Sequence, residues 1–569
     1  MKEKSSYPIK YNFSIENAHQ QYVQIRVDFP ENTALSEIKL PVWRPGRYEI
    51  ANFAKNIKSF RIFDSNGKKV AFHKKNKSTW VLNSKPLSGL RIEYLYFSNE
   101  LNAGSTFLDE NQLYVNPVNC CIYVDELIDY KCQLTIDVPA SWQIATGLNQ
   151  KDGVFISSNY DQLADSPFVC SKSLQCKTYK MGGCKFYIWV NGDFKPLWDK
   201  WLNDFKLFTQ KQIEKFIEFP VKEYHFLIHA LPFKAYHGVE HLSSTVITLG
   251  PSEQINNKLY KELLGISSHE LYHVWNVKSI RPVEMLPYDF SKENYSELGY
   301  IYEGITTYMG DLFLLKSDVF TVEQYFFELN NQLQRHFDNP GRFNYSVAES
   351  SFDTWLDGYV LGAPGRKVSI YVEGCLLAFV TDVRILQSTS GKYGLDEVMK
   401  RLFFNYAMKG VGVTEEIFKK EIENISGSCF NAFFQNFIHG NHSYESILND
   451  SLNVLGLQLN VSKSSNFIES YIGCKVVNSI KTEKRKVITT VYPGSPAELA
   501  CLKIGDELNL ESVNHLKEEI GNEIIVHRKN KEFNVELPQV NKNFYNKYSV
   551  SFIDNPIKEQ NRLFEAWKN

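Results

Sequence analysis

The sequence predicts a multidomain α+β protein with a β-rich N-terminal domain, a mixed central domain and a small strand-rich C-terminal domain. Three observations support this prediction. Alternating apolar and polar runs fill residues 1–175, a helical pattern begins after Pro251 and continues to about residue 446, and short strand patterns return over 455–545. A chain of 569 residues is long enough for three or four domains.

The N-terminal region, residues 1–175, has the pattern of an all-β domain. Runs such as "YVQIRVDF", "RIEYLYF" and "YKCQLTIDV" alternate between apolar and polar residues. Turn-forming clusters such as "DSNGKK" and "NQKDG" separate these runs. Period-two alternation between turns is typical of half-buried strands.

The central region, residues 176–450, begins with strands and continues with helices. The first part contains "KFYIWV", "EYHFLIHAL" and "STVITL", which are strand-like, and the rest is mostly helical by periodicity. Residues 455–545 then return to short strands around "VYPGSPAELACLKIGDELNL", and residues 546–569 read as a closing helix.

Composition excludes several classes of partner. Lys plus Arg is 63 and Asp plus Glu is 65, so the net charge of -2 gives no attraction to nucleic acid or to an anionic membrane. No apolar run approaches the roughly 18 residues that span a bilayer. Ten scattered cysteines and an N-terminus without an apolar signal-peptide region lead us to expect reduced thiols and a cytoplasmic location.

Two histidines four residues apart, with a glutamate after the first, occur in "GISSHELYHVWNVKSIRP" (265–282). Residues four apart lie one above the other on a helix, so His269 and His273 can point their imidazoles at one ion. Glu270 is positioned to sit beside a water molecule on that ion, which is the chemistry of the HExxH zinc hydrolases. The alternative is an ordinary amphipathic helix that carries two hydrogen-bonded histidines.

A third metal ligand is expected in "SELGYIYEGITTYMGDL" (296–312). Glu303 lies among apolar neighbours, where a carboxylate is costly unless it is paired or bound to a metal. Glu297 is an alternative ligand, but it lies near the start of the expected helix, where acidic residues are common.

These two motifs together resemble the glycyl aminopeptidase family of zinc metallopeptidases, within the larger group that includes thermolysin. The extended match "HELYHVWNVKSIRP" followed by "YEGITTYMGDL" is far longer than HExxH alone. "LPVWRPGRYEIANFAKNI" (40–57) resembles the N-terminal β-domain of the family, and "ESSFDTW" (349–355) and "SIYVEGCLLAFVTDVRI" (369–385) resemble its helical part. The resemblance implies a thermolysin-like catalytic domain that binds one zinc ion per chain through His269, His273 and Glu303.

The resemblance also implies the residues that contact the substrate. "YHGVEHLSS" (236–244) is similar to the segment with which aminopeptidases hold the free amine of a peptide, which implies roles for Gly238, Glu240 and His241. Val239 stands where aminopeptidase N has methionine. A glutamate near the metal can pair with an N-terminal ammonium and limit binding to chain ends.

"IYVEG" resembles a Tyr-x-Lys-Gly segment whose tyrosine stabilises the oxyanion, which implies that role for Tyr371. Glu373 occupies the lysine position, a reversal of charge. Glu270 is then the general base, which takes a proton from water and passes it to the leaving amine.

The C-terminal stretch "PGSPAELACLKIGDEL" (493–508) resembles part of a PDZ domain, with Cys501 where glycine is usual. "YIGCKV" (471–476) is the candidate loop for binding the C-terminal carboxylate of a peptide. A PDZ-like fold that packs on the catalytic domain without its own ligand is equally compatible with the sequence.

We therefore expect a zinc aminopeptidase that acts on peptides with a free N-terminus, and the family resemblance implies a preference for Gly or Ala. Two alternatives remain. One is a zinc endopeptidase of the same group, in which Glu240 does not block the cleft. The other is a binding protein in which the PDZ-like domain acts on an inactive peptidase scaffold.

Overall fold

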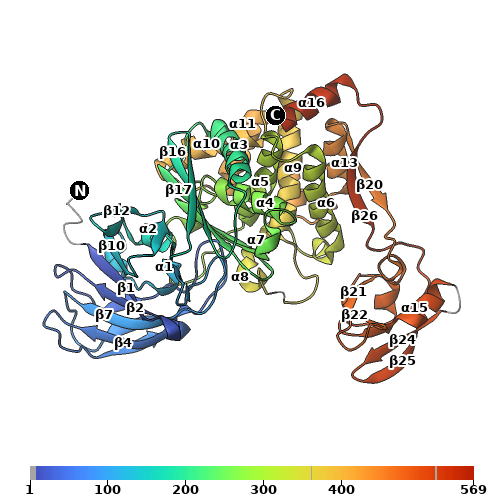
Figure 1. Ribbon diagram of the computed structural model, residues 1–569. Helices are drawn as coiled ribbons and strands as arrows, with labels where there is room; N and C mark the ends of the chain where they lie inside the picture. Colours follow the sequence, from blue (N-terminus) through green and yellow to red (C-terminus); the bar gives the residue numbers. More distant parts are fainter. Residues whose placement is uncertain (1–7, 361, 519–521) are drawn as a thin grey trace.

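The computed structural model describes residues 8–360, 362–518 and 522–569. Figure 1 shows a β-rich N-terminal part, a largely helical central part and a separate C-terminal domain. This arrangement confirms the predicted multidomain α+β architecture with a β-rich N-terminal domain. Residues 1–7, on which part of the signal-peptide prediction rests, lie outside the described residues.

The N-terminal part contains three sheets with alternating burial, as in β2, where every second residue is buried. A seven-stranded sheet has the order β12 (Asn149–Lys151), β13 (Val154–Ser157), β10 (Cys132–Asp137), β1 (Ile9–Asn17), β2 (Tyr22–Asp28), β7 (Arg91–Phe97) and β4 (Ile57–Phe63). The smaller sheets are β11 (Gln143–Thr146), β14 (Phe168–Ser171), β9 (Gln112–Val115) and β8 (Phe107–Leu108), and β3 (Glu37–Lys39), β6 (Thr79–Leu82) and β5 (Phe72–Asn76). Two short helices, α1 (Pro117–Cys120) and α2 (Tyr160–Ala164), lie in the same part.

The central part begins with a five-stranded sheet that leads into the helices. Its order is β15 (Gln175–Met181), β16 (Cys184–Asn191), β17 (Glu223–Ala230), β19 (Ser244–Gly250) and β18 (Ala235–Glu240). α3 (Trp198–Phe216) connects the parallel strands β16 and β17. Because β18 pairs with β19 alone and lies at the edge of the sheet, one side of its backbone is free of strand partners within the described residues.

The helices of the central part surround α9 (Ile370–Ser388), which is buried along almost its whole length. A helix that is apolar on all sides is typical of the centre of a large core. The other helices are α4 (Tyr260–Tyr272), the π-helical segment η6 (Tyr300–Ile305), α5 (Thr306–Lys316), α6 (Val322–Asp338), α7 (Val347–Phe352), α8 (Thr354–Asp357), α10 (Leu395–Asn405), α11 (Glu415–Ser426), α12 (Asn431–Phe433) and α13 (Glu445–Val454).

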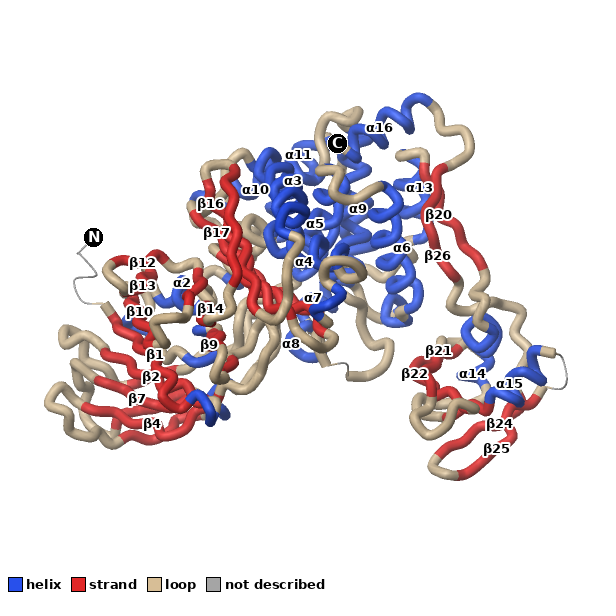
Figure 2. The backbone as a smooth tube through the Cα atoms, in the orientation of Figure 1, coloured by secondary structure: helices blue, strands red, loops and turns tan. Residues whose placement is uncertain are grey.

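The C-terminal domain has its own apolar core, and a pair of strands connects it to the rest (Figure 2). β20 (Leu457–Ser462) and β26 (Lys547–Phe552) form this pair. Between them lie β21 (Cys474–Asn478), β22 (Arg485–Val491), β23 (Glu507–Asn509), β24 (Glu523–Arg528) and β25 (Lys531–Glu536) in one sheet, with α14 (Pro496–Leu499) and α15 (Leu510–Lys517). The PDZ-like identity of this domain stays a prediction.

The chain ends in α16 (Lys558–Lys568), which packs against α9 and α5 of the central part. Trp567 is buried, and its Nε1 donates to the hydroxyl of Tyr308 at 2.8 Å. All ten cysteines are free, as expected from the sequence. Among the described residues, no helix is both long enough and apolar enough to cross a membrane.

Candidate active site

The two histidines of the HExxH motif lie at the C-terminal end of α4. His273 caps the helix, and its backbone N–H still donates to the carbonyl of His269, so the two side chains stay one turn apart. Their Nε2 atoms are 3.0 Å apart. Gly310 of α5 packs against the backbone of His269, where an added Cβ would come within 2.9 Å of the Cα. This close packing fixes the position of α4.

Glu303 comes from η6, directly before α5. Its Oε2 lies 3.4 Å from the Nε2 of His273 and 3.9 Å from the Nε2 of His269. The carboxylate is buried, whereas Glu297, the alternative ligand, is exposed and does not join this group. The sequence pattern predicted a helix around Glu303 but not its π-helical form, which is frequent at functional sites.

The three ligand atoms fit a metal ion. Two atoms that each lie about 2.0–2.1 Å from one zinc at tetrahedral angles are about 3.3–3.4 Å apart, and the three observed separations span that value. Burial lowers the pKa of His269, which favours the neutral imidazole that a metal requires. The spacing and the chemistry of the donors therefore suit a site of two histidines and one glutamate.

Asn276, from the "HVWN" part of the motif, connects the ligands. The Nδ1 of His273 donates to the carbonyl of Asn276 at 2.9 Å, which directs the Nε2 toward Glu303 and leaves that nitrogen to bind a metal ion. The side-chain Nδ2 of Asn276 donates at 2.9 Å both to the carbonyl of Ile301 and to the hydroxyl of Thr306. One asparagine therefore holds the histidine helix against the segment that carries Glu303.

Glu270 lies beside the ligands in the wall of the same cavity. It is 5% exposed, and burial, together with the charges of Glu240 and Glu303, raises its pKa well above the usual range. Gly238 of β18 faces it so closely that an added Cβ would lie 2.1 Å from the Oε1 of Glu270. A side chain at position 238 would therefore displace Glu270.

Tyr371, in the first turn of α9, lines the cavity on the side of Glu303. Burial and the nearby Glu303 raise the pKa of Tyr371, so its hydroxyl stays protonated and can donate a hydrogen bond. Gly304 of η6 and Gly374 of α9 bring the two elements together, because an added Cβ on Gly304 would lie 2.3 Å from the Cα of Gly374.

The reversed charge at Glu373 lies outside the main cavity. Its two carboxylate oxygens each lie 2.8 Å from the Nδ1 of His336, and both side chains are buried. The ring of His336 stacks on Tyr444 at a centroid distance of 4.6 Å. Glu373 therefore joins α9 to α6 and does not contribute charge to the cavity.

Glu240 and His241 follow one another in sequence but have different surroundings. Glu240 ends β18 and lines the cavity, with a carboxylate oxygen within 4.8 Å of ligand atoms on Glu270 and His273. His241 is buried outside the cavity, where its Nδ1 lies 3.0 Å from Asp165. Adjacent residues in a strand point to opposite sides, and His241 packs against the N-terminal part, so its contact with substrate stays a prediction.

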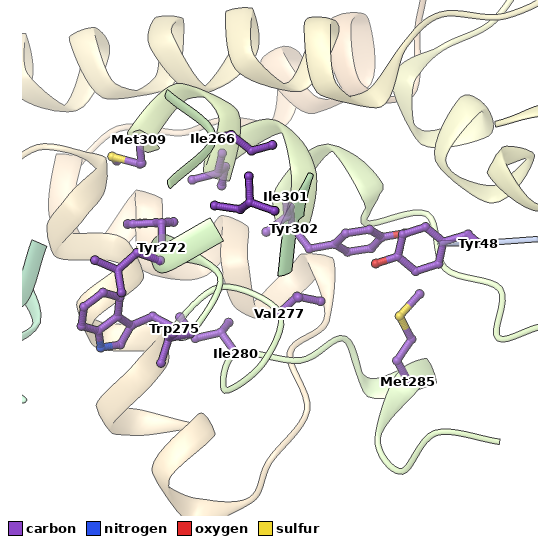
Figure 3. Close-up of a cluster of buried hydrophobic side chains, with 14 of the residues drawn as sticks. Tyr48, Ile266, Tyr272, Trp275, Val277, Ile280, Met285, Ile301, Tyr302 and Met309 are labelled. Atoms are coloured by element: carbon purple, nitrogen blue, oxygen red, sulfur yellow. The ribbon is translucent and has the colours of Figure 1, made fainter. Parts of the chain in front are cut away.

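The cavity has a volume of about 680 Å³ and extends along the exposed face of α4 from His273 to Lys261. No pattern in the sequence indicated that Gly46, from the N-terminal part, closes one end of this cavity. An added Cβ on Gly46 would lie 2.5 Å from the Oε2 of Glu240. Tyr48, two residues later, packs beside Tyr302 at a centroid distance of 5.2 Å (Figure 3). No local pattern could predict these two contacts, because both join segments that are far apart in the sequence.

Comparison with known proteins agrees with this geometry. Residues 10–172 match the Peptidase M61 N-terminal domain, and residues 262–377 match the M61 glycyl aminopeptidase. The chain is a metallopeptidase of the M61 glycyl aminopeptidase family. The second match includes His269, Glu270, His273 and Glu303.

Solved structures were also compared with this M61 peptidase. A crystal structure described as an aminopeptidase N family protein from Idiomarina loihiensis is 25% identical, covers 99% of this chain and 100% of its own, and has a TM-score of 0.88. A variant of an M1 zinc metallopeptidase from Deinococcus radiodurans, bound to a Tyr-Ser-Ala substrate, is 12% identical, covers 76% of this chain and 94% of its own, and has a TM-score of 0.48. No curated protein matched the chain.

Proposed function

We propose that this M61 peptidase is a zinc aminopeptidase that releases one residue at a time from the free N-terminus of peptides, with Gly or Ala preferred. The surroundings of Glu240 carry this proposal. Its carboxylate is 4% exposed, and its Oε1 has no hydrogen-bond partner among residues 8–360, 362–518 and 522–569. A buried carboxylate is costly without a cation, so a substrate ammonium is the fitting partner.

The closed end of the cavity supports exopeptidase action. The loop that carries Gly46 lies directly over Glu240 and is held by a hydrogen bond from the backbone N–H of Tyr48 to the hydroxyl of Tyr359, at 3.2 Å. The guanidinium of Arg47 lies 4.7 Å from the ring centre of Tyr359. A peptide cannot continue beyond Glu240 through this contact, and a large first side chain would have little room.

The open end supports binding of the rest of the peptide. The free edge of β18 can pair with an extended substrate strand. From His273 to Lys261 the cavity follows α4 for about 18 Å, at 1.5 Å per residue, which is room for about five extended residues. The scissile bond would lie beside Glu270, with the first residue toward Glu240.

In this proposal the residues of the chain have distinct roles. His269, His273 and Glu303 would hold one zinc ion, which supplies a Lewis acid when bound. Glu270 accepts a proton from the attacking water and passes it to the leaving amine. Tyr371 donates a hydrogen bond to the oxygen on which negative charge develops. Glu240 sets the register by pairing with the ammonium.

Purified wild-type protein tests the proposal. Alanyl and glycyl fluorogenic substrates should be cleaved, their N-acetyl counterparts should be cleaved poorly, and a chelator should abolish the activity. Internal cleavage of blocked peptides at a rate equal to trimming of free ends would favour an endopeptidase. Absence of cleavage of any peptide by zinc-loaded protein would favour a binding protein.

For the C-terminal domain, binding of a peptide C-terminus at residues 471–476 is a weaker possibility. This segment already contacts other parts of the chain. The backbone N–H of Phe544 donates at 3.1 Å to the carbonyl of Ser470, directly before the segment, and Lys475 within it forms an ion pair with Asp338 of α6. These contacts favour a packing role.

A further inference from the structure

A buried arginine, Arg44, lies just behind the loop that closes the cavity. Arg44 is 4% exposed, and its guanidinium packs over Gly104, where an added Cβ would lie 2.0 Å from the Cζ. Within the described part of the chain, its side chain forms no hydrogen bond or ion pair, and its Nη1 is shielded from solvent. A buried charge without a counterion is unfavourable, so this position favours an anionic partner.

Two other arginines of low exposure, unlike Arg44, lie close to carboxylates. Arg366 forms ion pairs with Asp353 at 2.6 Å and Asp357 at 2.8 Å. The Nη1 of Arg281 lies 3.8 Å from Asp161. Arg44 lacks such a carboxylate, although Glu240 is near enough to act on it through space.

Arg44 lines a second cavity of about 250 Å³ in the N-terminal part. Lys55 also lines it and forms no ion pair among the residues described, and Thr106 places a hydroxyl there. Arg47 is paired with Glu49, and Glu100 lies exposed at the cavity rim. Apart from the Arg47–Glu49 pair, two cations, Arg44 and the exposed Lys55, and one acid, Glu100, therefore line this cavity, and this balance of charge suits a small anion.

The position of this cavity connects it with substrate binding. Arg44 lies two residues before Gly46, which touches the carboxylate of Glu240. The guanidinium of Arg44 acts on the carboxylate of Glu240 through space and so competes with a substrate ammonium for it, and an anion beside Arg44 reduces that competition. We infer that the cavity binds a small monoanion, a halide or a short carboxylate, at Arg44 and thereby strengthens capture of the substrate amine at Glu240. The effect on substrate, but not the binding itself, rests on the function proposed above.

The kinetic test uses an alanyl substrate at constant ionic strength, with the sodium salt of a bulky sulfonate replaced stepwise by chloride, bromide or acetate. In the wild type, KM should fall at least about 5-fold, the lower range of coupling between two sites, with little change in kcat. Arg44→Gln should abolish the response. The matched control Arg61→Gln, at an arginine of β4 that pairs with Glu93 on the surface, should keep it. An unchanged wild-type KM in all four salts, or a full response in Arg44→Gln, would overturn the inference.

Direct binding tests the site without relying on activity or on the folding of a variant. Crystals of the wild type soaked in bromide should show anomalous scattering beside the Arg44 guanidinium, and acetate should displace it. Absence of bromide there would overturn the inference. If the protein failed to release N-terminal residues, the proposed function would fall, whereas bromide at Arg44 would still support the anion site.

The substrate itself is the other source of a carboxylate. Aspartyl and alanyl substrates should therefore be compared in wild type and in Arg44→Gln. Equal effects of the substitution on both substrates would support a free anion. A wild-type preference for the aspartyl substrate that disappears in Arg44→Gln would overturn it, because the substrate side chain would then occupy the cavity.

Discussion

Two buried histidine–glutamate clusters lie on opposite sides of one helix contact, and they differ in a way that defines a metal site. Glu303 and Glu373 each precede a glycine, and these two glycines, Gly304 and Gly374, touch. On one side, Glu303 meets two histidines and faces a large cavity. On the other side, Glu373 presents both oxygens to a single nitrogen of His336.

The difference shows that burial and pairing alone do not bring three ligand atoms together. Three ligand atoms converge at His269, His273 and Glu303, whereas the pair of Glu373 and His336 offers no third ligand among the residues described. The stacking of His336 on Tyr444 further fixes its ring in a packing role. Convergence of donors on one point, beside space for a substrate, separates the catalytic cluster from the structural one.

The sharpest test of this contrast compares one histidine from each cluster. His273→Ala should remove the bound zinc, about one per chain in the wild type, and lower activity more than about 1000-fold, since proton transfer alone contributes 10²–10⁴-fold. His336→Ala should retain the metal. Metal analysis of the purified proteins and alanyl-substrate assays provide the readouts. Zinc retained by His273→Ala would remove the distinction between the clusters.

Substitution of Glu270 should separate the proposed proton transfer from metal binding. Glu270→Gln keeps the shape of the side chain but cannot accept a proton, so kcat should fall by about 10²–10⁴-fold while zinc content stays at the wild-type value. Near-normal turnover in this variant would contradict the general-base role.

Substitution of Glu240 should mainly slow the cleavage of substrates with a free amine. An ammonium paired with a buried carboxylate contributes about 2–4 kcal/mol, so Glu240→Ala should lower kcat/KM by about 30- to 1000-fold. Residual cleavage of N-acetylated substrates should change much less. Glu297→Ala, at an exposed glutamate, is the matched control and should behave as wild type. Equal losses on free and blocked substrates would indicate a different role for Glu240.

The sequence predicted the α4 ligands because their geometry is local. His269, Glu270 and His273 lie within two helical turns, so their spacing alone determines which side chains can meet. Glu303 was identified as a carboxylate in an apolar segment, and the structure brings it to the two histidines.

Other parts of the site depend on contacts between distant segments, which spacing does not encode. Gly46 meets Glu240 from a different domain, and the N–H of Leu242 donates to Asp165 at 2.9 Å beside the buried His241. The sequence placed Glu373 in the lysine position of a catalytic motif, but only the fold reveals its partner. Such details follow from how the N-terminal part and the helices pack.

The smallest expected effect concerns the structural cluster itself. Glu373→Gln should leave a buried hydrogen bond without its charged acceptor, which costs about 1–3 kcal/mol. At roughly 2–4 °C per kcal/mol for a domain of this size, the melting temperature should fall by about 2–12 °C. Zinc content should not change, and kcat should change little, because Glu373 lies outside the cavity that holds Tyr371. Combining Glu373→Gln with His336→Phe should destabilise less than the sum of the single changes, since the two residues share one interaction. Loss of zinc in Glu373→Gln would show that the two clusters act as one unit across the Gly304–Gly374 contact.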